Sequence, residues 1–413
     1  MTPQIKQRIE QIRRGEVPDG YKKTKVGVVP CEWEDTLFSD LFTSTSEYTE
    51  DLDKYPLYSL TIEEGITAKT ERYERSHLVK KENAYKIVRP NDFAYNPMNV
   101  RFGAVARHKG AIDVAVSGYY DIFTTRVDSD LEFMDSFLIS DHMIAYYNKV
   151  SIGSLVEKQR VHFSQFMDFK LSIPSELERW KIAEILSAQD KLIALKEKLI
   201  EEKKQQKKAL MQRLLAGKKR LPGFSGEWVD VKLGDIFTER VETNCQDLEL
   251  LSVTGTNGVV PRSTIETKDN SSEDKSKYLK ICKGDIGYNT MRMWQGVSAL
   301  SEYEGIVSPA YTILIPSPEI SAKYFSYLFK MHAVIFLFYR FSQGIVDDTR
   351  SLKYYEFAKL HLTVPSDKKE QEAIADILTV ANKEIEILQK DLDQEKQKKK
   401  ALMQLLLTGI VRV

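Results

Sequence analysis

Two short stretches of the chain have residue types that could perform chemistry on an amine: NPMN (Asn96–Asn99) and NTMR (Asn289–Arg292). Amino-methyltransferases hold their target amine in a loop of asparagine, two prolines and a stacking aromatic residue. NPMN lacks the second proline and the aromatic residue, and NTMR lacks even the first proline. No glycine-rich cofactor loop precedes either stretch. We therefore do not expect a catalytic loop at these positions.

Other catalytic and metal-binding motifs are missing as well. Cys31, Cys245 and Cys282 stand apart with no CxxC spacing, and the six histidines are scattered, so neither a disulfide framework nor a zinc site is predicted. The sequence has no GxxxxGK phosphate loop, no HExxH and no GxSxG. We expect no catalytic residues, no metal ligands and no cofactor.

The composition is that of a water-soluble protein of two or three domains. Of 413 residues, 42% are hydrophobic. Lys+Arg and Asp+Glu both total 60, so the net charge of the chain does not indicate a polyanionic partner. No apolar run reaches the ~20 residues of a membrane span, and the start MTPQIKQRIEQIRRGE has no apolar signal core. We expect a cytoplasmic protein without a membrane partner.

The elements that would position any site are written twice. KKALMQRLLAG (Lys207–Gly217) returns as KKALMQLLLTG (Lys399–Gly409), 192 positions later, and the same offset relates Ile182 to Ile374. Between these landmarks no gap is needed and about half of the aligned residues are identical. A long continuous helix requires such gap-free alignment, because one inserted residue would rotate its faces by about 100°.

The repeat continues outside the helices. Matching pairs are LSIP (171–174) with LTVP (362–365), YNPM (95–98) with YNTM (288–291), Asp92 with Asp285, Gly103 with Gly296, and Trp33 with Trp228. GEVPDGY (15–21) at the start also resembles GKKRLPGF (217–224), which follows the first long helix. The segment that follows the first long helix therefore has its second copy at the start of the chain and not after the second helix. This circular permutation of the repeat predicts a pseudo-two-fold arrangement with the two termini close together.

This pattern predicts an α+β fold of two globular α/β domains separated by two long antiparallel coiled-coil helices. The predicted segments are an N-terminal helical segment (1–20), a globular domain (21–174), a long helix (175–217), a second globular domain (218–365) and a C-terminal long helix (366–413). The apolar seam is expected at Ile182, Ile185, Leu192 and Leu199, and at Ile374, Ile377, Ala381, Leu388 and Leu392. Gly217 and Gly409 fit as C-cap residues of the two helices.

Several of these motifs, in this order, resemble the specificity subunits of type I restriction–modification systems. They include RRGEVPDGYKKTKVG at the start, VPSDKKEQEAIADIL at the beginning of the second long helix, YNTMRMWQG, IVSPAY, and the KKALMQ helix ends. The resemblance covers both halves of the chain. It departs from the family pattern in IPSELERWKIAEIL, where Arg179 stands in place of the glutamine found at Gln371 in the second copy.

The resemblance implies that each globular domain is a target-recognition domain for one half of a bipartite site in double-stranded DNA. It also implies that the long helices act as a spacer and dock two copies of the modification (methyltransferase) subunit, which endonuclease subunits join. The chain itself would carry no active site. Two alternatives remain open: a non-catalytic coiled-coil scaffold with duplicated protein-binding domains, and a self-sufficient methyltransferase, which the missing cofactor loop disfavours.

DNA contacts are predicted in the repeated loops, where Asn and Gln could pair with adenine and Arg with guanine. The predicted residues are Tyr95, Asn96, Arg101, Tyr288, Asn289, Arg292, Gln295, Arg350 and Lys353. Because two domains that read different sequences should differ at readout positions, Arg101, Arg292 and Gln295 are better specificity candidates than the repeated Tyr-Asn pairs. The alternative for those pairs is that they hold a turn inside each domain. Each globular segment has a slight acidic excess of about three to four charges, so we expect DNA affinity to come from local patches.

Overall fold

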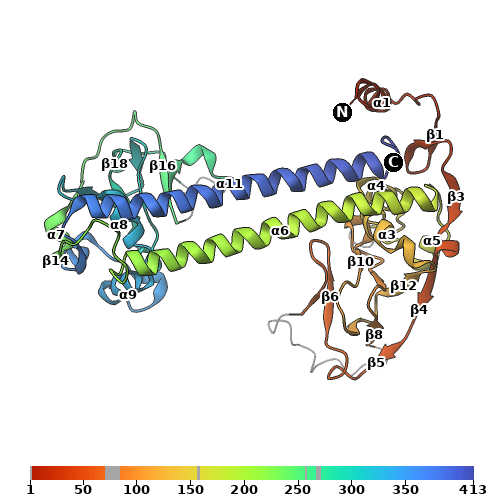
Figure 1. The fold of residues 1–413 in the computed structure, drawn as a ribbon, viewed down its shortest axis with the longest axis horizontal. Coiled ribbons are helices and arrows are strands. Elements are labelled where there is room, and N and C mark those ends of the chain that lie inside the picture. The colour runs from red at the N-terminus through yellow and green to blue at the C-terminus, as the bar shows by residue number, and fades with distance from the viewer. Residues whose placement is uncertain (1, 70–83, 156–158, 256–257, 267–270) are drawn as a thin grey trace. The chain divides into compact units, whose positions relative to one another are not determined.

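The computed structural model describes residues 2–69, 84–155, 159–255, 258–266 and 271–413, which form two compact units (Figure 1). Unit 1 contains Met1–Lys196 and Asp391–Val413, and unit 2 contains Glu197–Lys390. Both ends of the chain belong to unit 1, where the Tyr21 hydroxyl donates to the Gly409 carbonyl over 2.7 Å. The predicted closeness of the two termini is confirmed.

Each unit is built on a four-stranded antiparallel sheet. In unit 1 the order is β10 (Val105–Arg107), β9 (Phe93–Tyr95), β12 (Asp121–Thr125) and β4 (Phe42–Thr45). In unit 2 the order is β20 (Ser298–Leu300), β19 (Ile286–Asn289), β22 (Tyr311–Pro316) and β15 (Phe237–Glu239). The strands follow the same path in both sheets, so the sequence repeat is a repeat of the fold.

The smaller sheets repeat in the same way. In unit 1, β8 (Tyr85–Val88) lies between β11 (Val114–Ser117) and β5 (Tyr48–Thr49). Unit 1 also pairs β6 (Tyr58–Thr61) with β7 (Gly65–Ala68), and β13 (Lys170–Ile173) with β3 (Glu34–Leu37). Unit 2 pairs β21 (Gly305–Val307) with β18 (Leu279–Ile281), β16 (Leu251–Thr254) with β17 (Gly258–Pro261), and β23 (His361–Pro365) with β14 (Trp228–Lys232). Unit 1 adds a hairpin of β1 (Tyr21–Thr24) and β2 (Gly27–Pro30).

Short helices and an aromatic core complete each unit. Unit 1 contains α1 (Pro3–Arg13), α2 (Phe38–Leu41), α3 (Leu131–Phe137), α4 (Asp141–Val150) and α5 (Phe163–Met167). Unit 2 contains α7 (Leu233–Ile236), α8 (Ala322–Leu328), α9 (His332–Phe341) and α10 (Tyr354–Phe357). Fully buried phenylalanines fill both cores, among them Phe42 and Phe123 in unit 1 and Phe325 and Phe357 in unit 2. No helix among the described residues is both long and apolar enough to cross a membrane.

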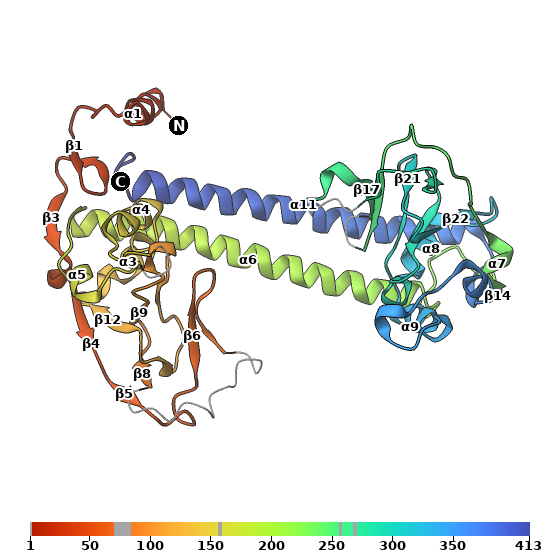
Figure 2. The same ribbon diagram turned by 180° about the vertical axis from the view of Figure 1, so that it is seen from behind.

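The two long helices are α6 (Glu176–Leu214) and α11 (Lys368–Leu406). Three of their four ends lie within three residues of the predicted bounds. The C-terminal end of α11 lies seven residues before the predicted bound at residue 413. In unit 1 the first part of α6 lies beside the last part of α11, as both views show (Figures 1 and 2). There the Gln189 amide donates to the Glu395 carboxylate over 2.7 Å, and Lys196 pairs with Asp391. Residue numbers rise on one helix as they fall on the other, so this pairing is antiparallel.

In unit 2 the remaining parts of the helices pair antiparallel too, with Lys203 bonded to Glu384. The seam differs from the predicted one, because it follows Ile182, Leu186, Gln189, Ile193, Lys196, Ile200 and Lys203, which are three and four residues apart. Polar side chains occupy some of these heptad positions and pair with carboxylates of α11. The predicted seam residues Leu199 and Ile377 are instead 38% and 37% exposed, so that part of the prediction is wrong.

A glycine follows each long helix, three residues after its last helical residue. Gly217 and Gly409 have φ angles of 65° and 69°, in the left-handed region that glycine adopts without strain. A Cβ atom on Gly409 would lie 2.9 Å from the Trp33 ring, and one on Gly217 would lie 3.3 Å from the Trp228 ring. Each glycine therefore ends its helix and also leaves space for the repeated tryptophan of its unit.

A repeated ion pair holds the start of each long helix. In unit 2, Arg220 donates from Nε and Nη2 to the Glu370 carboxylate over 2.7 and 2.8 Å. In unit 1, Arg412 binds Glu178 in the same two-pronged way, and the Trp33 indole donates to the same carboxylate over 3.2 Å. Arg220 and Arg412, and likewise Glu178 and Glu370, are 192 residues apart, so the two ion pairs are copies of one structural feature.

The family glutamine that is missing from the first copy has a structural role in the second. Gln371 is 2% exposed, donates to the Pro365 carbonyl over 2.9 Å and accepts from the Ser321 amide over 2.9 Å. Arg179 stands at the equivalent position and donates to the Pro174 carbonyl over 2.9 Å. Both residues thus anchor the strand end before the helix, which explains how arginine can replace glutamine here.

Candidate nucleic-acid interface

Tyr95, Asn96 and Tyr288 of the repeated Tyr-Asn pairs are buried, and Asn289 is half-buried. Tyr95 in β9 and Tyr288 in β19 are 0% exposed, and burial raises the pKa of both hydroxyls. The Tyr95 hydroxyl donates to the Val161 carbonyl over 2.9 Å. Asn96 and Asn289 each accept a backbone N–H two residues ahead, from Met98 (3.1 Å) and Met291 (2.9 Å). These contacts account for the repeated pairs through packing and turn formation.

Each turn leads into a short 3-10 helix, η3 (Val100–Phe102) in unit 1 and η7 (Met293–Gln295) in unit 2. Arg292 and Gln295 are exposed at the two sides of η7. Arg101 in η3 is only 9% exposed, because its guanidinium donates to Gln159 over 3.0 Å and lies 4.4 Å from the Phe102 ring centre. The equivalent helices therefore present different side chains.

In unit 2 these residues belong to a larger surface centred on Tyr339 of α9. The Arg350 guanidinium lies 4.1 Å from the Tyr339 ring centre, and the rings of Trp294 and Phe336 lie 6.1 and 6.4 Å from it. We call the set Arg292, Trp294, Gln295, Phe336, Tyr339 and Arg350 the readout surface of unit 2. It combines aromatic rings that reach the surface with guanidinium and amide donors.

A loop borders this surface and carries the remaining predicted residues. Gln343 and Ser351 form an antiparallel bridge that closes the loop, and Ile345 within it is 99% exposed. The Leu352 amide donates to the Thr290 carbonyl over 2.9 Å, which joins the loop to the turn before η7. The structure therefore brings Arg292, Gln295, Arg350 and the exposed Lys353 into one region, although they are distant in sequence.

Unit 1 has the same scaffold with other side chains. Ile152 and Arg160 form the equivalent bridge, and α4 takes the place of α9. Asn148 of α4 donates to the Arg101 carbonyl over 2.7 Å, and Phe102 beside it is 48% exposed. Residues 156–158 of the loop lie outside the described part of the chain. The equivalent surface is thus built on Asn148 and Gln159 where unit 2 has Tyr339 and Arg350.

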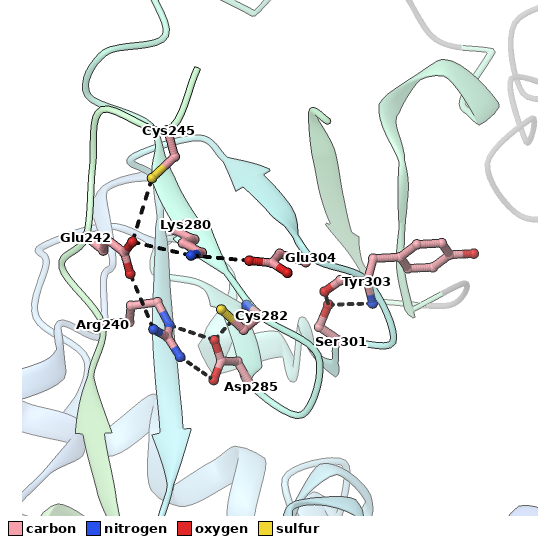
Figure 3. Close-up of polar contacts among 9 residues, drawn as sticks. All are labelled: Arg240, Glu242, Cys245, Lys280, Cys282, Asp285, Ser301, Tyr303 and Glu304. Carbon is pink, nitrogen blue, oxygen red and sulfur yellow. Dashed lines mark hydrogen bonds and ion pairs between the residues drawn. The ribbon is translucent and has the colours of Figure 1, made fainter. Parts of the chain in front are cut away.

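A second polar cluster in unit 2 joins β18, the residue before β19 and the chain after β15 (Figure 3). Arg240 donates to Asp285 over 2.8 and 3.1 Å, and Lys280 lies within 3.4 Å of Glu242 and 3.2 Å of Glu304. The cluster was not predicted from the sequence. Two cations face three carboxylates, and each cation has at least one acidic partner, so the arrangement favours structural cross-linking over ligand binding.

Two cysteines lie at this cluster. Burial raises the pKa of the Cys282 thiol, and its backbone N–H donates to Asp285 over 2.8 Å. Cys245 donates to Glu242 at the edge of the cluster. A thiol with a raised pKa is protonated at neutral pH, which disfavours a nucleophilic role for Cys282. Among the described residues, no group of three or more His, Cys, Asp or Glu side chains gathers as a metal ion requires.

Sequence reasoning missed the aromatic part of the readout surface. The segment VIFLFY (334–339) predicts a buried core helix, and Val334 and Phe338 are indeed buried. Phe336 and Tyr339, however, are 55% and 38% exposed on the opposite face of the same helix. The helical spacing of the segment carries this signal, because residues two and five positions after Val334 cannot share its face.

Comparison with known proteins matches this architecture. Residues 225–396 match the family model described as "Type I restriction modification DNA specificity domain". The crystal structure of a type I restriction-modification system S subunit from M. genitalium superposes with a TM-score of 0.54 at 13% identity, covering 91% of this chain and 96% of that one. A second structure, whose description names "complex assembly" and "conformational transition of the type I R-M system", superposes with a TM-score of 0.54 at 13% identity. The match covers 93% of this chain and 99% of that one.

At this identity the two solved structures show the fold, while the family model identifies the domain. The predicted α+β fold is confirmed by both likenesses. The resemblance drawn from the motifs is confirmed as well. Residues 225–396 match the family of type I restriction-modification DNA specificity domains, and the chain has the fold of the two solved structures.

Proposed function

We propose that each unit recognises one half of a bipartite sequence in double-stranded DNA. The observation that carries this proposal is a repeated scaffold with unequal surfaces: η3, α4 and the bridged loop of unit 1 recur as η7, α9 and the bridged loop of unit 2. Packing residues such as Tyr95 and Tyr288 are the same in both units, whereas the exposed side chains differ. Two readers of different sequences require this combination.

The chemistry of the readout surface suits base recognition. An arginine can bond to O6 and N7 of guanine, and a glutamine to N6 and N7 of adenine. Arg292 and Gln295 are exposed and can reach such edges. Arg350 is held over the Tyr339 ring, so less side-chain freedom is lost when its guanidinium bonds to a base. Exposed Ile345 and Phe336 provide the apolar contacts that a thymine methyl group accepts.

In this proposal the modification subunits dock on the long helices. Leu195 and Ile387 occupy equivalent positions of α6 and α11 and are 65% and 66% exposed. Large apolar side chains left in water at the same place on both helices fit two identical partners. Such partners, and the endonuclease subunits that join them, would perform methylation and cleavage, and the specificity chain would select the site.

The slight acidic excess of the globular segments gives a second expectation. Phosphate contacts release counterions, so few contacts mean weak binding with a shallow salt dependence. We expect the isolated chain to bind its site weakly and with low salt sensitivity, and the binding to tighten when modification subunits are added. Full-strength specific binding by the isolated chain would contradict this division of labour.

Exchange of one recognition segment tests the proposal. The chain is expressed with its modification partner and the methylated sequences of the host are determined. We expect a two-part motif with an unspecified gap, and replacing residues 226–365 with the segment of another specificity subunit should change one half only. The matched control replaces residues 21–174 and should change the other half. An unaltered motif after either exchange would refute the proposal, and absence of sequence-specific methylation would favour a protein-binding scaffold.

A further inference from the structure

Unit 2 contains a pocket of about 740 Å³ between the end of α6, the start of α9 and α11. Five lysines and a histidine line it: Lys204, Lys207, Lys208, Lys218, Lys330 and His332. No acidic residue is among the residues that line the pocket. We call this feature the lysine pocket. It concentrates positive charge in a unit whose globular segment is slightly acidic.

Two of these lysines are partly removed from water. Burial, together with the nearby charge of Lys207, lowers the pKa of Lys330 to about 8. Burial also lowers the pKa of Lys207. The Glu386 carboxylate acts against this shift at Lys207, so one nearby acidic charge faces the five lysines. An excess of positive groups held close together favours an anionic ligand, because the ligand would relieve both the repulsion and the desolvation.

The start of α9 adds to this environment. Its N-cap residue is Met331, which provides no side-chain hydrogen bond to the first turn, and His332 and Ala333 line the pocket. The partial positive charge of a helix N-terminus attracts anions, and phosphate groups in particular. The lysines and the helix therefore act in the same direction.

The equivalent pocket in unit 1 shows that the fold does not impose this charge. It measures about 300 Å³ and is lined by Lys400, Met403 and Gln404, the repeats of Lys208, Met211 and Gln212. There Ile139 stands in place of Lys330 and Asp141 in place of His332. Gln404 donates to Asp141 over 2.8 Å. The lysine pocket is thus a feature of unit 2 alone.

We propose that the lysine pocket binds a backbone phosphate of the DNA beside the half-site read by unit 2. This inference rests on the proposed function and adds the site of phosphate contact. Two observations place the pocket next to the readout surface. Lys330 Nζ donates to the carbonyl of Gly296, the residue after Gln295, over 2.7 Å. Helix α9 also runs from His332 in the pocket to Tyr339 in the readout surface.

The test removes the charge of two lysines of the pocket in the assembled complex of this chain with its modification subunits. The variant is Lys204→Gln/Lys208→Gln, and the matched control is Lys396→Gln/Lys400→Gln at the equivalent positions of α11. DNA affinity is measured against salt concentration for target and random duplexes. Removal of one phosphate interaction should lower the slope of log K against log salt by about 0.9.

We expect the Lys204→Gln/Lys208→Gln variant to lose affinity by the same factor for target and random DNA, with the shallower slope and an unchanged methylation motif. The control should keep the wild-type slope. A wild-type slope in the variant, with sequence specificity intact, would overturn the phosphate site and leave the proposed function standing. Absence of sequence-specific binding by the wild-type complex would instead refute the proposed function.

Two further outcomes would assign the pocket to another ligand and overturn the proposal. In the first, the variant fails to assemble with modification subunits on size-exclusion chromatography, which would identify the pocket as a protein-docking site. In the second, inorganic pyrophosphate raises the melting temperature of the wild-type chain but not of the variant, while the DNA salt slope stays the same. That result would identify a free phosphate compound as the occupant.

Discussion

The repeated ion pair at the start of the long helices gives a prediction with an internal comparison. Replacing Arg220 with methionine leaves the Glu370 carboxylate, which is 1% exposed, without its two guanidinium hydrogen bonds. An uncompensated buried charge costs about 3–5 kcal/mol. We expect Arg220→Met to destabilise unit 2 by roughly that amount.

The equivalent change in unit 1 should cost less. The Arg412 side chain is 38% exposed, and after Arg412→Met the Trp33 indole would still donate to Glu178. The loss then resembles that of hydrogen bonds to one charged group, about 2 kcal/mol. In unit 2 the equivalent Trp228 indole has no hydrogen-bond partner among the described residues, so it cannot compensate.

Hydrogen exchange measured by mass spectrometry reports the two units separately, which a single melting temperature would not. Arg220→Met should raise the exchange of core amides in β19 and β22 more than Arg412→Met raises that in β9 and β12. The double variant Glu370→Met/Arg220→Met should recover most of the loss, because no charge remains buried. Equal destabilisation by the two single variants, or no recovery in the double variant, would refute the reasoning.

Three further predictions concern the helix ends, the readout surface and acid stability. Gly409→Ala should destabilise unit 1 by about 1–2 kcal/mol for the left-handed backbone plus about 1–3 kcal/mol for the clash with Pro30 and Trp33. Gly217→Ala should cost less, because a Cβ there meets only the Trp228 ring at 3.3 Å, and chemical denaturation would show the difference. Arg350→Ala should lower discrimination at one base pair of one half-site by about 1–3 kcal/mol, measured by methylation of single-mismatch targets, with the other half-site as the control. Burial lowers the pKa of His142 to about 4, whereas in the unfolded chain the pKa is about 6.5. Between these values only the unfolded chain takes up the proton, so the folded state keeps its full stability above about pH 6.5 and loses stability as the pH falls toward 4. Exchange of unit 1 amides should rise over this range, and His142→Gln should flatten the rise.

Much of the fold could be predicted because the chain contains its own alignment. The gap-free offset between the KKALMQ ends predicted two long helices of equal length, and α6 and α11 both span 39 residues. The glycines after them predicted C-caps. The seam could not be predicted as well, because Gln189, Lys196 and Lys203 occupy heptad positions that apolar periodicity alone would not assign to an interface.

The site was predicted less completely for a physical reason. Motif spacing located the turns before η3 and η7, but it could not show that Tyr95 and Tyr288 point inward, because tyrosine suits both a core and a binding surface. Arg350 reaches Tyr339 only through a loop closed by the bridge from Gln343 to Ser351. Such a contact depends on tertiary structure and leaves no local pattern.

The two copies of the fold also separate packing from recognition. Positions that are identical in both units and buried, such as Tyr95 and Tyr288, serve the scaffold that both units share. Positions that differ and are exposed can distinguish two DNA sequences, as at the readout surface. A third class is exposed yet similar in both copies, as are Leu195 and Ile387, and neither packing within a unit nor a difference in target explains it. Such positions are expected where one kind of partner binds twice, so the same comparison that locates base readout also locates the surface for identical subunits.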